Sequence, residues 1–403
     1  MQDIFVGRQP IYDRDLNVVA YELLFRSGTE NRAGPLDGDQ ATSQVILNAF
    51  VEIGLDRVVG ACPAYVNLTR NLLLDDESLP LPPERAVLEV LEDVPVDAAL
   101  LQALGRLRAR GYTIALDDFV LDPGREALLE HARIVKLDLQ RLTAPELDAH
   151  ITALRPYDLT LLAEKVETHA ELEQCRALGF EYFQGYFFSR PKIVTGQRIP
   201  ANRLTILQLL AELQNPHIEV EELEQLIRRD VALSYRLLRY INSAFFALPR
   251  EVDSIRQAVI YLGLKAIRTW ATLIALSGID DKPHELMTTA MVRAKMCELL
   301  AEARKLPVRE SCFTAGLFSA LDALMDMPME SVVESLPLSA EITGALLGRE
   351  GTIGRTLTQV LDYEQARWQH MDRADLSAAQ LTDIYLQAVE WAQEVTRALG
   401  PNR

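Results

Sequence analysis

The chain of 403 residues has few cysteines and no long apolar run. Its four cysteines, Cys62, Cys175, Cys297 and Cys312, show no CxxC spacing and no adjacent histidine, so neither a disulfide framework nor a zinc site is expected. No segment approaches the ~18 consecutive apolar residues of a membrane span. The first residues also lack the basic stretch and apolar run of a secretory signal. These absences predict a cytoplasmic protein.

Basic residues are outnumbered, because 41 Lys and Arg stand against 58 Asp and Glu, and the formal net charge is −17. Such a charge repels phosphate backbones and anionic lipid, so we expect neither nucleic acid nor a membrane as a partner. Hydrophobic residues make up 49% and charged residues 25% of the chain, the proportions of a soluble globular protein. The length favours two or three domains.

Residues 1–191 alternate short β-rich apolar runs with amphipathic segments. Turn residues at 13–17 separate the first two runs and predict a hairpin. Strand, helix and strand then alternate, which favours parallel pairing through right-handed crossovers. Eight candidate strands predict a (β/α)8 barrel of the TIM type with one antiparallel strand. An open doubly wound sheet is the alternative, because periodicity does not distinguish a closed sheet from an open one.

The rhythm of the sequence changes after Pro191. Residues 192–203 contain Gly196 and Pro200 and show no apolar period, so we assign them as a linker. Residues 204–403 read almost throughout as helices punctuated by Pro and Gly, as helix ends require. The fold class predicted for the whole chain is therefore α/β plus all-α, with domains at 1–191 and 204–403.

Carboxylate and amide side chains recur near the carboxyl ends of the predicted strands. They are Glu22, Asn67, Glu89, Asp117, Asp118, Asp138, Glu164, Glu167 and Gln184. In a (β/α) barrel these ends converge on one mouth, where so many carboxylates with one lysine, Lys136, would repel one another unless they held protons or cations. Oxygen ligands suit Mg²⁺ or Mn²⁺, and two such ions ~3.5–4 Å apart suit phosphodiester cleavage. The alternative is helix capping, to which we assign Asp122 and Glu126.

Seven motifs follow one another through this half of the chain. They are ELLFR (22–26), VNL (66–68), LEVLE (88–92), ALDDF (115–119), VKLD (135–138), AEKVET (163–168) and FQGYFFSRP (183–191). In this order they resemble the EAL domain, the family of cyclic di-GMP phosphodiesterases and their inactive relatives. The resemblance spans residues 1–191 and implies a (β/α)8 barrel, a divalent-metal site and cyclic di-GMP as substrate or ligand.

The same resemblance implies roles for ten residues of the mouth. The implied ligands of Mg²⁺ or Mn²⁺ are Glu22, Asn67, Glu89 and Asp117. The implied catalytic residues are Glu164, as general base or further ligand, Lys136, which would contact the attacking water, and Asp118. The implied substrate-binding residues are Arg26, which would face a phosphate, Gln184 and Glu167.

The chain departs from the family's pattern in three places. It has ELL in place of EAL, a mild change because the glutamate remains. Catalytic members continue from ALDDF with a glycine-rich loop, whereas this chain has Val120-Leu121-Asp122-Pro123-Gly124, although Glu92 matches the residue that braces that loop. Lys165 stands where active members carry glycine, and its cation could compete with a metal for the carboxylates.

These departures predict a weakly active or inactive barrel that acts as a nucleotide-responsive or regulatory module for the second domain. One alternative is an active phosphodiesterase that uses Mg²⁺ or Mn²⁺ and yields the linear dinucleotide. The other is an interaction scaffold that does not respond to the nucleotide.

In the helical half, LLRYINSAFFALPREVDSIRQAVIYLGLKAIRTWA (237–271) resembles the HDOD domain, an all-α module related to the HD phosphohydrolases. An HD enzyme needs an adjacent His-Asp pair, but residues 316–320 read GLFSA. The half is therefore predicted to be a binding or output module without catalysis that acts through an unknown protein partner, with the oligomeric state left open. Trp270, Phe245 and Phe246 could line an interaction pocket, although aromatic residues at helical spacing usually belong to the core.

Overall fold

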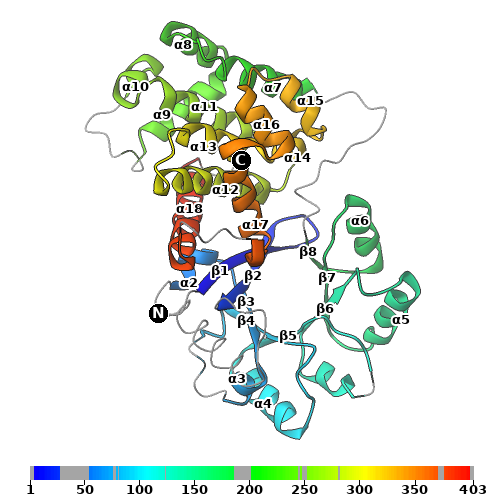
Figure 1. Ribbon diagram of the computed structural model, residues 1–403. Coiled ribbons are helices and arrows are strands. Elements are labelled where there is room, and N and C mark those ends of the chain that lie inside the picture. The colour runs from blue at the N-terminus through cyan, green and yellow to red at the C-terminus, as the bar shows by residue number, and fades with distance from the viewer. Residues whose placement is uncertain are drawn as a thin grey trace. The chain divides into compact units, whose positions relative to one another are not determined.

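The computed structural model describes residues 4–27, 54–75, 79, 81–122, 124–185, 201–243, 246, 252–279, 282–370 and 376–399. Two compact units make up the chain (Figure 1). The first comprises Met1–Phe188 and Asp362–Leu386, and the second comprises Ser189–Leu361 and Gln387–Arg403. The domain boundaries expected from the sequence remain a prediction. In the described part of the chain, no helix combines the length and apolar character that crossing a membrane requires.

The strands of the first unit close into a barrel in chain order (Figure 1). They are β1 (Ile4–Tyr12), β2 (Val18–Ser27), β3 (Ala64–Leu68), β4 (Ala86–Val90), β5 (Thr113–Leu116), β6 (Ile134–Asp138), β7 (Thr160–Glu164) and β8 (Tyr182–Gln184). Strand β1 is antiparallel to both β2 and β8, and the other neighbouring strands pair in parallel. The predicted barrel with one antiparallel strand is confirmed, and the open sheet is wrong.

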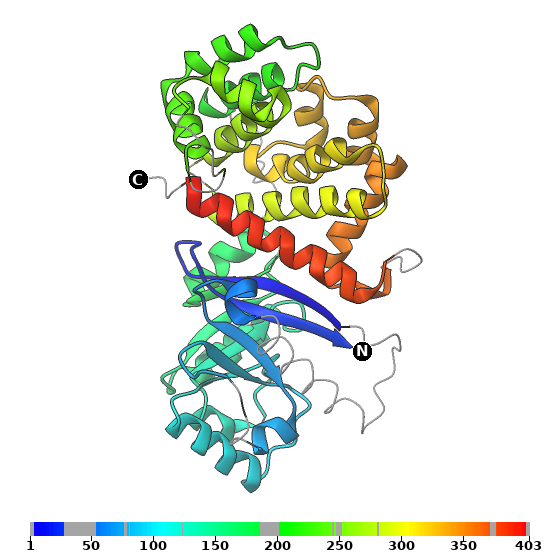
Figure 2. The same ribbon diagram turned by 90° about the vertical axis from the view of Figure 1, so that its left-hand side faces the viewer.

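The long β1–β2 hairpin is fixed by its turn (Figure 2). The carboxylate of Asp13 accepts hydrogen bonds from the backbone N–H groups of Asp15, at 2.9 Å, and Asn17, at 2.8 Å. This short side chain replaces part of the backbone pairing of the turn, as Asp commonly does. The sequence signal at residues 13–17 therefore has a direct structural cause.

Short helices connect the parallel strands. They are α2 (Leu55–Val59), α3 (Arg70–Leu74), α4 (Ala98–Ala109), the 3-10 helix η3 (Glu126–Glu130), α5 (Ala144–Leu154) and α6 (His169–Leu178). Local sequence sets their ends: the Asp97 carboxylate accepts from the Leu100 N–H to start α4, and Thr168 forms a capping box with Glu171 at the start of α6. Helix α6 ends at Gly179, whose φ of +96° suits glycine.

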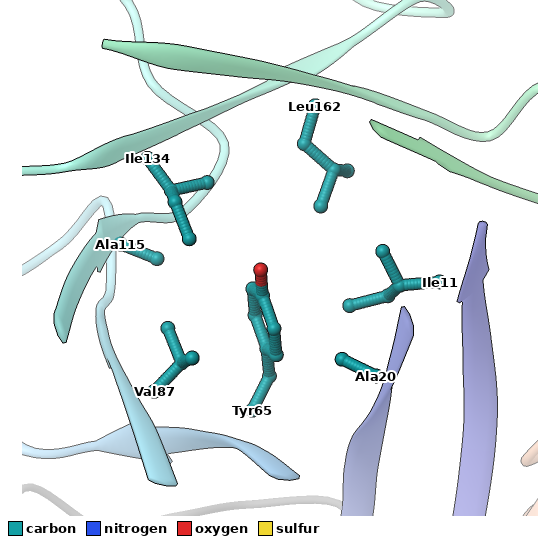
Figure 3. Close-up of a cluster of buried hydrophobic side chains, with 7 residues drawn as sticks. All are labelled: Ile11, Ala20, Tyr65, Val87, Ala115, Ile134 and Leu162. Carbon is teal, nitrogen blue, oxygen red and sulfur yellow. The ribbon is translucent and has the colours of Figure 1, made fainter. Parts of the chain in front are cut away.

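An apolar layer fills the barrel, with one side chain from each of seven strands (Figure 3). Its members are Ile11, Ala20, Tyr65, Val87, Ala115, Ile134 and Leu162. The Tyr65 ring lies among the other six side chains (Figure 3). The two alanines leave room for this ring, since a packed interior must be filled without voids.

Strand β1 packs against residues of the C-terminal part of the chain that belong to the same unit. The ring of Trp368, in the 3-10 helix η5 (Trp368–His370), stacks on Phe5 with centroids 4.9 Å apart. The Tyr363 hydroxyl donates to the backbone oxygen of Val6 at 2.9 Å. An added Cβ at Gly7 would lie 3.4 Å from Trp368, at van der Waals contact, so the indole ring packs directly against this glycine. The barrel unit therefore depends on side chains far along the sequence.

The second unit is helical throughout its described residues, as predicted (Figure 1). The helices that begin in it are α7 (Ala201–Leu213), α8 (Val220–Arg229), α9 (Val231–Ile241), α10 (Ile255–Leu262), α11 (Leu264–Ser277), α12 (His284–Ala303), α13 (Arg309–Phe318), α14 (Leu321–Met325), α15 (Met329–Glu334), α16 (Ala340–Gly348) and α17 (Gly351–Glu364), and it also takes in the end of α18 (Ala378–Leu399). Helices α12 and α13 pack so closely that a Cβ at Gly316 would lie 2.6 Å from the backbone oxygen of Arg293.

Candidate functional site

Six of the ten predicted site residues lie one step along the strands from the apolar layer. Each of these six is two residues beyond a member of that layer, in the pairs Ala20–Glu22, Tyr65–Asn67, Val87–Glu89, Ala115–Asp117, Ile134–Lys136 and Leu162–Glu164. Side chains two residues apart on a strand share a face. The register that points the apolar residues into the barrel therefore points these polar residues into it as well, nearer the carboxyl ends of the parallel strands.

The ammonium group of Lys136 is fully buried and lies among four carboxylates. Its Nζ is 2.7 Å from both Glu89 Oε1 and Asp117 Oδ1. It is 3.0 Å from Glu164 Oε1 and 3.2 Å from Glu22 Oε2. One positive charge therefore faces four carboxylates, and the cluster carries an excess of negative charge when all four are ionised.

This excess shifts the pKa values of the cluster. Burial raises the pKa of Glu89 well above its usual value, and the charge of Glu22 adds to the shift. Burial likewise raises the pKa of Glu164 to about 8, against the opposing effect of Lys136, and raises that of Asp117. Burial also opposes the ionisation of Glu22, but Lys136 and the neighbouring amides outweigh it and lower the pKa. Without an added cation, the cluster is therefore a place that takes up protons.

Two amides orient the Glu22 carboxylate. Asn67 Nδ2 donates to Glu22 Oε1 at 3.1 Å, and Gln184 Nε2 donates to Glu22 Oε2 at 2.6 Å. Because the nitrogen of each amide points at Glu22, its oxygen is left over. The buried oxygens without a hydrogen-bond partner include Asn67 Oδ1, Glu89 Oε2, Glu164 Oε2 and Gln184 Oε1.

These leftover oxygens are the donors that a hard divalent cation prefers. The residues present therefore fit Mg²⁺ or a similar ion by their chemistry. The described residues nevertheless contain no group of three or more His, Cys, Asp or Glu side chains already arranged to hold a metal, since the carboxylates converge on the Lys136 ammonium. A cation that bound here would require this flexible side chain to withdraw from the centre of the cluster.

Asp118 lies beside the cluster in a backbone conformation that few residues adopt, with φ at +44°. Its Oδ2 accepts from the Arg141 guanidinium at 2.8 Å, and the same guanidinium lies 3.6 Å from Glu92 Oε1. Arg141 therefore links Asp118 to Glu92, the residue that matches the family's brace for this loop. Nothing in the sequence pattern indicated this arginine, because it lies in the turn after β6.

The loop after Asp118 is ordered by its own residues. The Phe119 N–H donates to the backbone oxygen of Lys136 at 3.0 Å, and the Phe119 ring is buried. The Asp122 carboxylate accepts from the N–H groups of Gly124, at 2.7 Å, and Arg125, at 3.1 Å. Asp122 thus caps the next turn, as expected from the sequence. Glu126 accepts from the Tyr157 hydroxyl at 3.1 Å.

Lys165 pairs with Asp138, which is not one of the four carboxylates around Lys136. Its Nζ lies 2.5 Å from Asp138 Oδ2. Burial opposes the charge of Lys165, but Asp138 outweighs it and raises the pKa. The residue has φ at +56°, a conformation in which glycine is unstrained. The lysine that replaces the family's glycine therefore keeps the backbone shape of a glycine and pairs with Asp138.

Two predicted residues remain: Glu167 lies at the edge of the cluster, and the side chain of Arg26 lies outside the described residues. Glu167 Oε1 accepts from Gln140 Nε2 at 2.8 Å at an exposed position. Arg26 belongs to β2, but its side chain lies outside the described residues. Gln9 was missed: its Oε1 accepts from Gln184 Nε2 at 3.0 Å. The signal for it was its place on the antiparallel strand, two residues from Ile11 of the apolar layer.

The helical unit has a different polar cluster at the position of the missing His-Asp pair. The buried Arg293 guanidinium lies 3.3 Å from Ser319 Oγ. Burial raises the pKa of Asp322, and Arg293 and Arg349 oppose that shift. Two guanidinium groups therefore act on the Asp322 carboxylate.

Comparisons with known proteins agree with these features. An EAL domain model matches residues 65–191 and an HDOD domain model matches residues 199–333. The uncharacterized protein YuxH of Bacillus subtilis is 35% identical over 98% of this chain and 99% of its own length. The cyclic di-GMP phosphodiesterase CdgJ of Vibrio cholerae is 35% identical over 99% of this chain and 94% of its own length. This chain belongs to the EAL–HDOD family.

The resemblance drawn from the motifs of this EAL–HDOD protein is therefore confirmed. Solved structures are also similar to it. The Bacillus subtilis YkuI protein, with an EAL domain, in complex with c-di-GMP and calcium, is 22% identical, with a TM-score of 0.38 over 57% of this chain and 69% of that chain. Klebsiella pneumoniae BlrP1, in a calcium/cy-diGMP complex, is 24% identical, with a TM-score of 0.39 over 47% of this chain and 56% of that chain.

Proposed function

We propose that this EAL–HDOD protein acts in cyclic di-GMP signalling and that its barrel is a divalent-cation-dependent phosphodiesterase. The substrate would be cyclic di-GMP and the product its linear dinucleotide. The observation that carries the proposal is the convergence of four carboxylates, with leftover buried oxygens beside them, at the carboxyl ends of the barrel strands. The relative named a cyclic di-GMP phosphodiesterase, which matches 99% of this chain, supports the same assignment.

The cation ligands in this proposal are Glu22, Asn67, Glu89 and Asp117, with Asp118 beside them. Mg²⁺ and Mn²⁺ both prefer such oxygen donors. When bound, the cation would offset the charge of the phosphodiester and lower the pKa of a water molecule. Glu89 and Asp117, whose pKa values are raised, would be ionised once a cation replaced their protons.

Glu164 and Lys136 would act on the attacking water. Hydrolysis adds one water across one P–O bond: a proton leaves the water as its oxygen attacks phosphorus, and the departing ribose oxygen gains a proton. Glu164 Oε2 has no hydrogen-bond partner and can accept the first proton. Its pKa of about 8 would fall beside a cation, so the carboxylate would be ionised near neutral pH. The Lys136 ammonium, displaced from the cluster, would donate to the water.

Substrate contacts would come from the rim of the barrel. Gln184 lies in the cluster and Glu167 at its exposed edge, where they would contact the nucleotide. Arg26 would face a phosphate, an assignment that rests on the motif resemblance alone.

All four cysteines are free, which supports the proposal that the protein works in the reducing cytoplasm.

A second candidate function is binding without turnover. The loop at residues 120–124 lacks the glycine-rich sequence of catalytic members, and the Lys136 ammonium lies at the point where the carboxylates converge. In this case the barrel would bind cyclic di-GMP and control the HDOD domain, which would pass the signal to a protein partner.

The test is turnover by the full-length protein. Cyclic di-GMP is incubated with Mg²⁺, with Mn²⁺ and with a chelator, and the products are separated by chromatography. We expect linear dinucleotide with a cation and none with the chelator. Asp117→Asn should abolish the product, whereas Asp148→Asn, on the exposed surface of α5, should not.

Unchanged nucleotide with the wild-type protein would exclude the phosphodiesterase. Binding measured on the same samples would then separate the remaining functions. Saturable binding of cyclic di-GMP would support the regulatory module, whereas no binding would leave only the scaffold.

A further inference from the structure

The helical unit has a cavity of its own, with a volume of about 290 Å³. Two of the three tryptophans of the chain line it, Trp270 of α11 and Trp391 of α18. Their ring centroids are 5.9 Å apart, and Phe313 of α13 meets Trp391 edge-on at the same distance. The cavity therefore has an aromatic wall built from three helices.

Two further aromatic rings pack against Trp270 of this wall. Tyr240 and Phe246 pack against Trp270 with centroid distances of 4.5 and 5.6 Å. Trp270 is 8% exposed and Tyr240 is fully buried. Trp270 therefore packs in the aromatic core, as expected from its helical spacing, and it also borders the cavity.

The cavity is lined by three basic and two acidic side chains. Lys265 pairs with Glu310 at 2.9 Å, and Lys295 pairs with Glu298 at 2.7 Å. The fifth charged lining residue, Arg268, is partly buried, and its side chain has no hydrogen bond or ion pair within the described residues. The lining therefore carries one more basic than acidic side chain, in a chain whose formal net charge is −17.

We propose that this cavity binds a small planar anion, with its ring against the tryptophan wall and its phosphate or carboxylate on Arg268. Aromatic rings gain from packing on tryptophan faces and edges, and a guanidinium pairs with planar or phosphate oxyanions through two N–H groups. The volume lies just below the usual range of about 300–1,000 Å³ for small-molecule sites, which suits one ring system with one anionic group. The site would give the helical unit a ligand independent of the barrel cluster.

Intrinsic tryptophan fluorescence tests the proposal on the full-length chain. Trp368→Phe removes the only tryptophan that does not line the cavity, so the remaining emission comes from Trp270 and Trp391. The probes are guanosine monophosphate and benzoate, each compared with its neutral analogue, guanosine or benzamide. We expect saturable quenching by at least one anion and at least ~10-fold weaker binding of its neutral analogue, the range expected when a hydrogen bond to a charged group is lost.

Arg268→Gln should weaken binding of the anion by a similar factor of about 10. Arg256→Gln, which replaces an exposed arginine of α10 paired with Glu221, should leave it unchanged. If Arg268→Gln lowers the melting temperature, Arg268→Lys keeps the charge and should bind more tightly than the glutamine variant.

The two probes also distinguish the source of the ligand. Binding of guanosine monophosphate alone assigns the site to nucleotides, benzoate alone to aromatic carboxylates, and binding of both to their shared chemistry. No saturable quenching, equal binding of the neutral analogues, or unchanged affinity in a folded Arg268→Gln chain would overturn the proposal. Asp117→Asn in the barrel should not alter the result, so failure here is separate from failure of the phosphodiesterase proposal.

Discussion

The barrel and the helical unit each bury a polar cluster, but the balance of charge differs between them. In the barrel, one ammonium faces four carboxylates. In the helical unit, the buried Arg293 and the nearby Arg349 act on the Asp322 carboxylate. Burial is common to both, so burial does not distinguish a cation site from a structural cluster. The excess of carboxylates, and the oxygens left without partners, make the difference.

The two cations also differ in what could replace them. Lys136 carries a compact charge on a flexible stem, whereas Arg293 presents a planar group that donates in several directions. A divalent cation can offset the carboxylates that Lys136 now offsets. Among the described residues, the buried oxygens without a hydrogen-bond partner include none of Ser319 or Asp322. The comparison predicts that divalent cations act on the barrel cluster and not on the helical one.

The largest effect should follow from Glu164→Gln. Removing a general base commonly lowers the rate about 10²–10⁴-fold, so turnover of cyclic di-GMP should fall by that factor. Glu173→Gln, at an exposed position of α6, and Ser319→Ala, in the helical cluster, should leave the rate unchanged. Product chromatography on the three variants checks this. Retention of more than about a tenth of the activity by Glu164→Gln would exclude its role as general base.

The next effect concerns stability. Lys136→Met leaves the buried carboxylates without their cation, and breaking such a pair costs about 3–5 kcal/mol. The melting temperature should therefore fall in the presence of a chelator, and Mn²⁺ should restore much of the loss. Arg293→Met should also lower the melting temperature, without recovery by Mn²⁺. Calorimetry of both variants with and without Mn²⁺ checks this contrast. If Mn²⁺ raised the melting temperatures of both variants, or of neither, the contrast between the two clusters would be wrong.

A smaller effect should appear as a pH dependence. The folded-state pKa values of Glu89 and Glu164 are raised, that of Glu164 to about 8. Between the unfolded value of 4.5 and about 8 the folded chain therefore binds more protons than the unfolded chain, and its stability falls as the pH rises. One such group changes the free energy of unfolding by up to about 1.4 kcal/mol per pH unit.

Thermal melts in chelator from pH 5 to 8 measure this slope. Glu164→Gln should flatten it, and the stabilisation by Mn²⁺ should grow with pH, because protons compete with the cation. The lowered pKa of Glu22 acts below 4.5 and so outside this window. A melting temperature that rises with pH in the absence of cations would contradict the assignment.

The smallest effect should come from Lys165→Gly. Glycine suits the φ of +56° at this position and relieves a strain of about 1–2 kcal/mol, but it costs about 0.4–1 kcal/mol through the larger entropy of the unfolded chain. The ion pair between the half-exposed Lys165 and the buried Asp138 is lost at the same time and offsets part of that gain, so the net change in stability should stay within about 2 kcal/mol. Mn²⁺ affinity, read from thermal shifts, should also change little. An increase in turnover of ten-fold or more would show that Lys165 does oppose catalysis.

Sequence reasoning succeeded where a local period carries the information. The carboxylates and amides near the ends of the apolar runs predicted the polar residues of the barrel mouth, whereas the apolar layer around Tyr65 was found only in the structure. The turn residues at 13–17 predicted the hairpin at Asp13. These features follow from neighbours along the chain, and a single sequence contains them.

Contacts between distant segments were not predictable in this way. Gln9 reaches Gln184 only because the barrel closes, and Arg141 reaches Asp118 from a separate turn. The stacking of Trp368 on Phe5 joins opposite ends of the chain. An apolar period shows that a face is buried, but it does not identify the surface on which that face packs.

A Mn²⁺ titration of the full-length protein, followed by electron paramagnetic resonance near pH 8, tests the central claim most directly. We predict saturable Mn²⁺ binding that Glu89→Gln and Asp117→Asn abolish and that Asp148→Asn leaves intact. The absence of saturable binding, or binding that persists unchanged in Asp117→Asn, would contradict the assignment of the barrel cluster as a divalent-cation site.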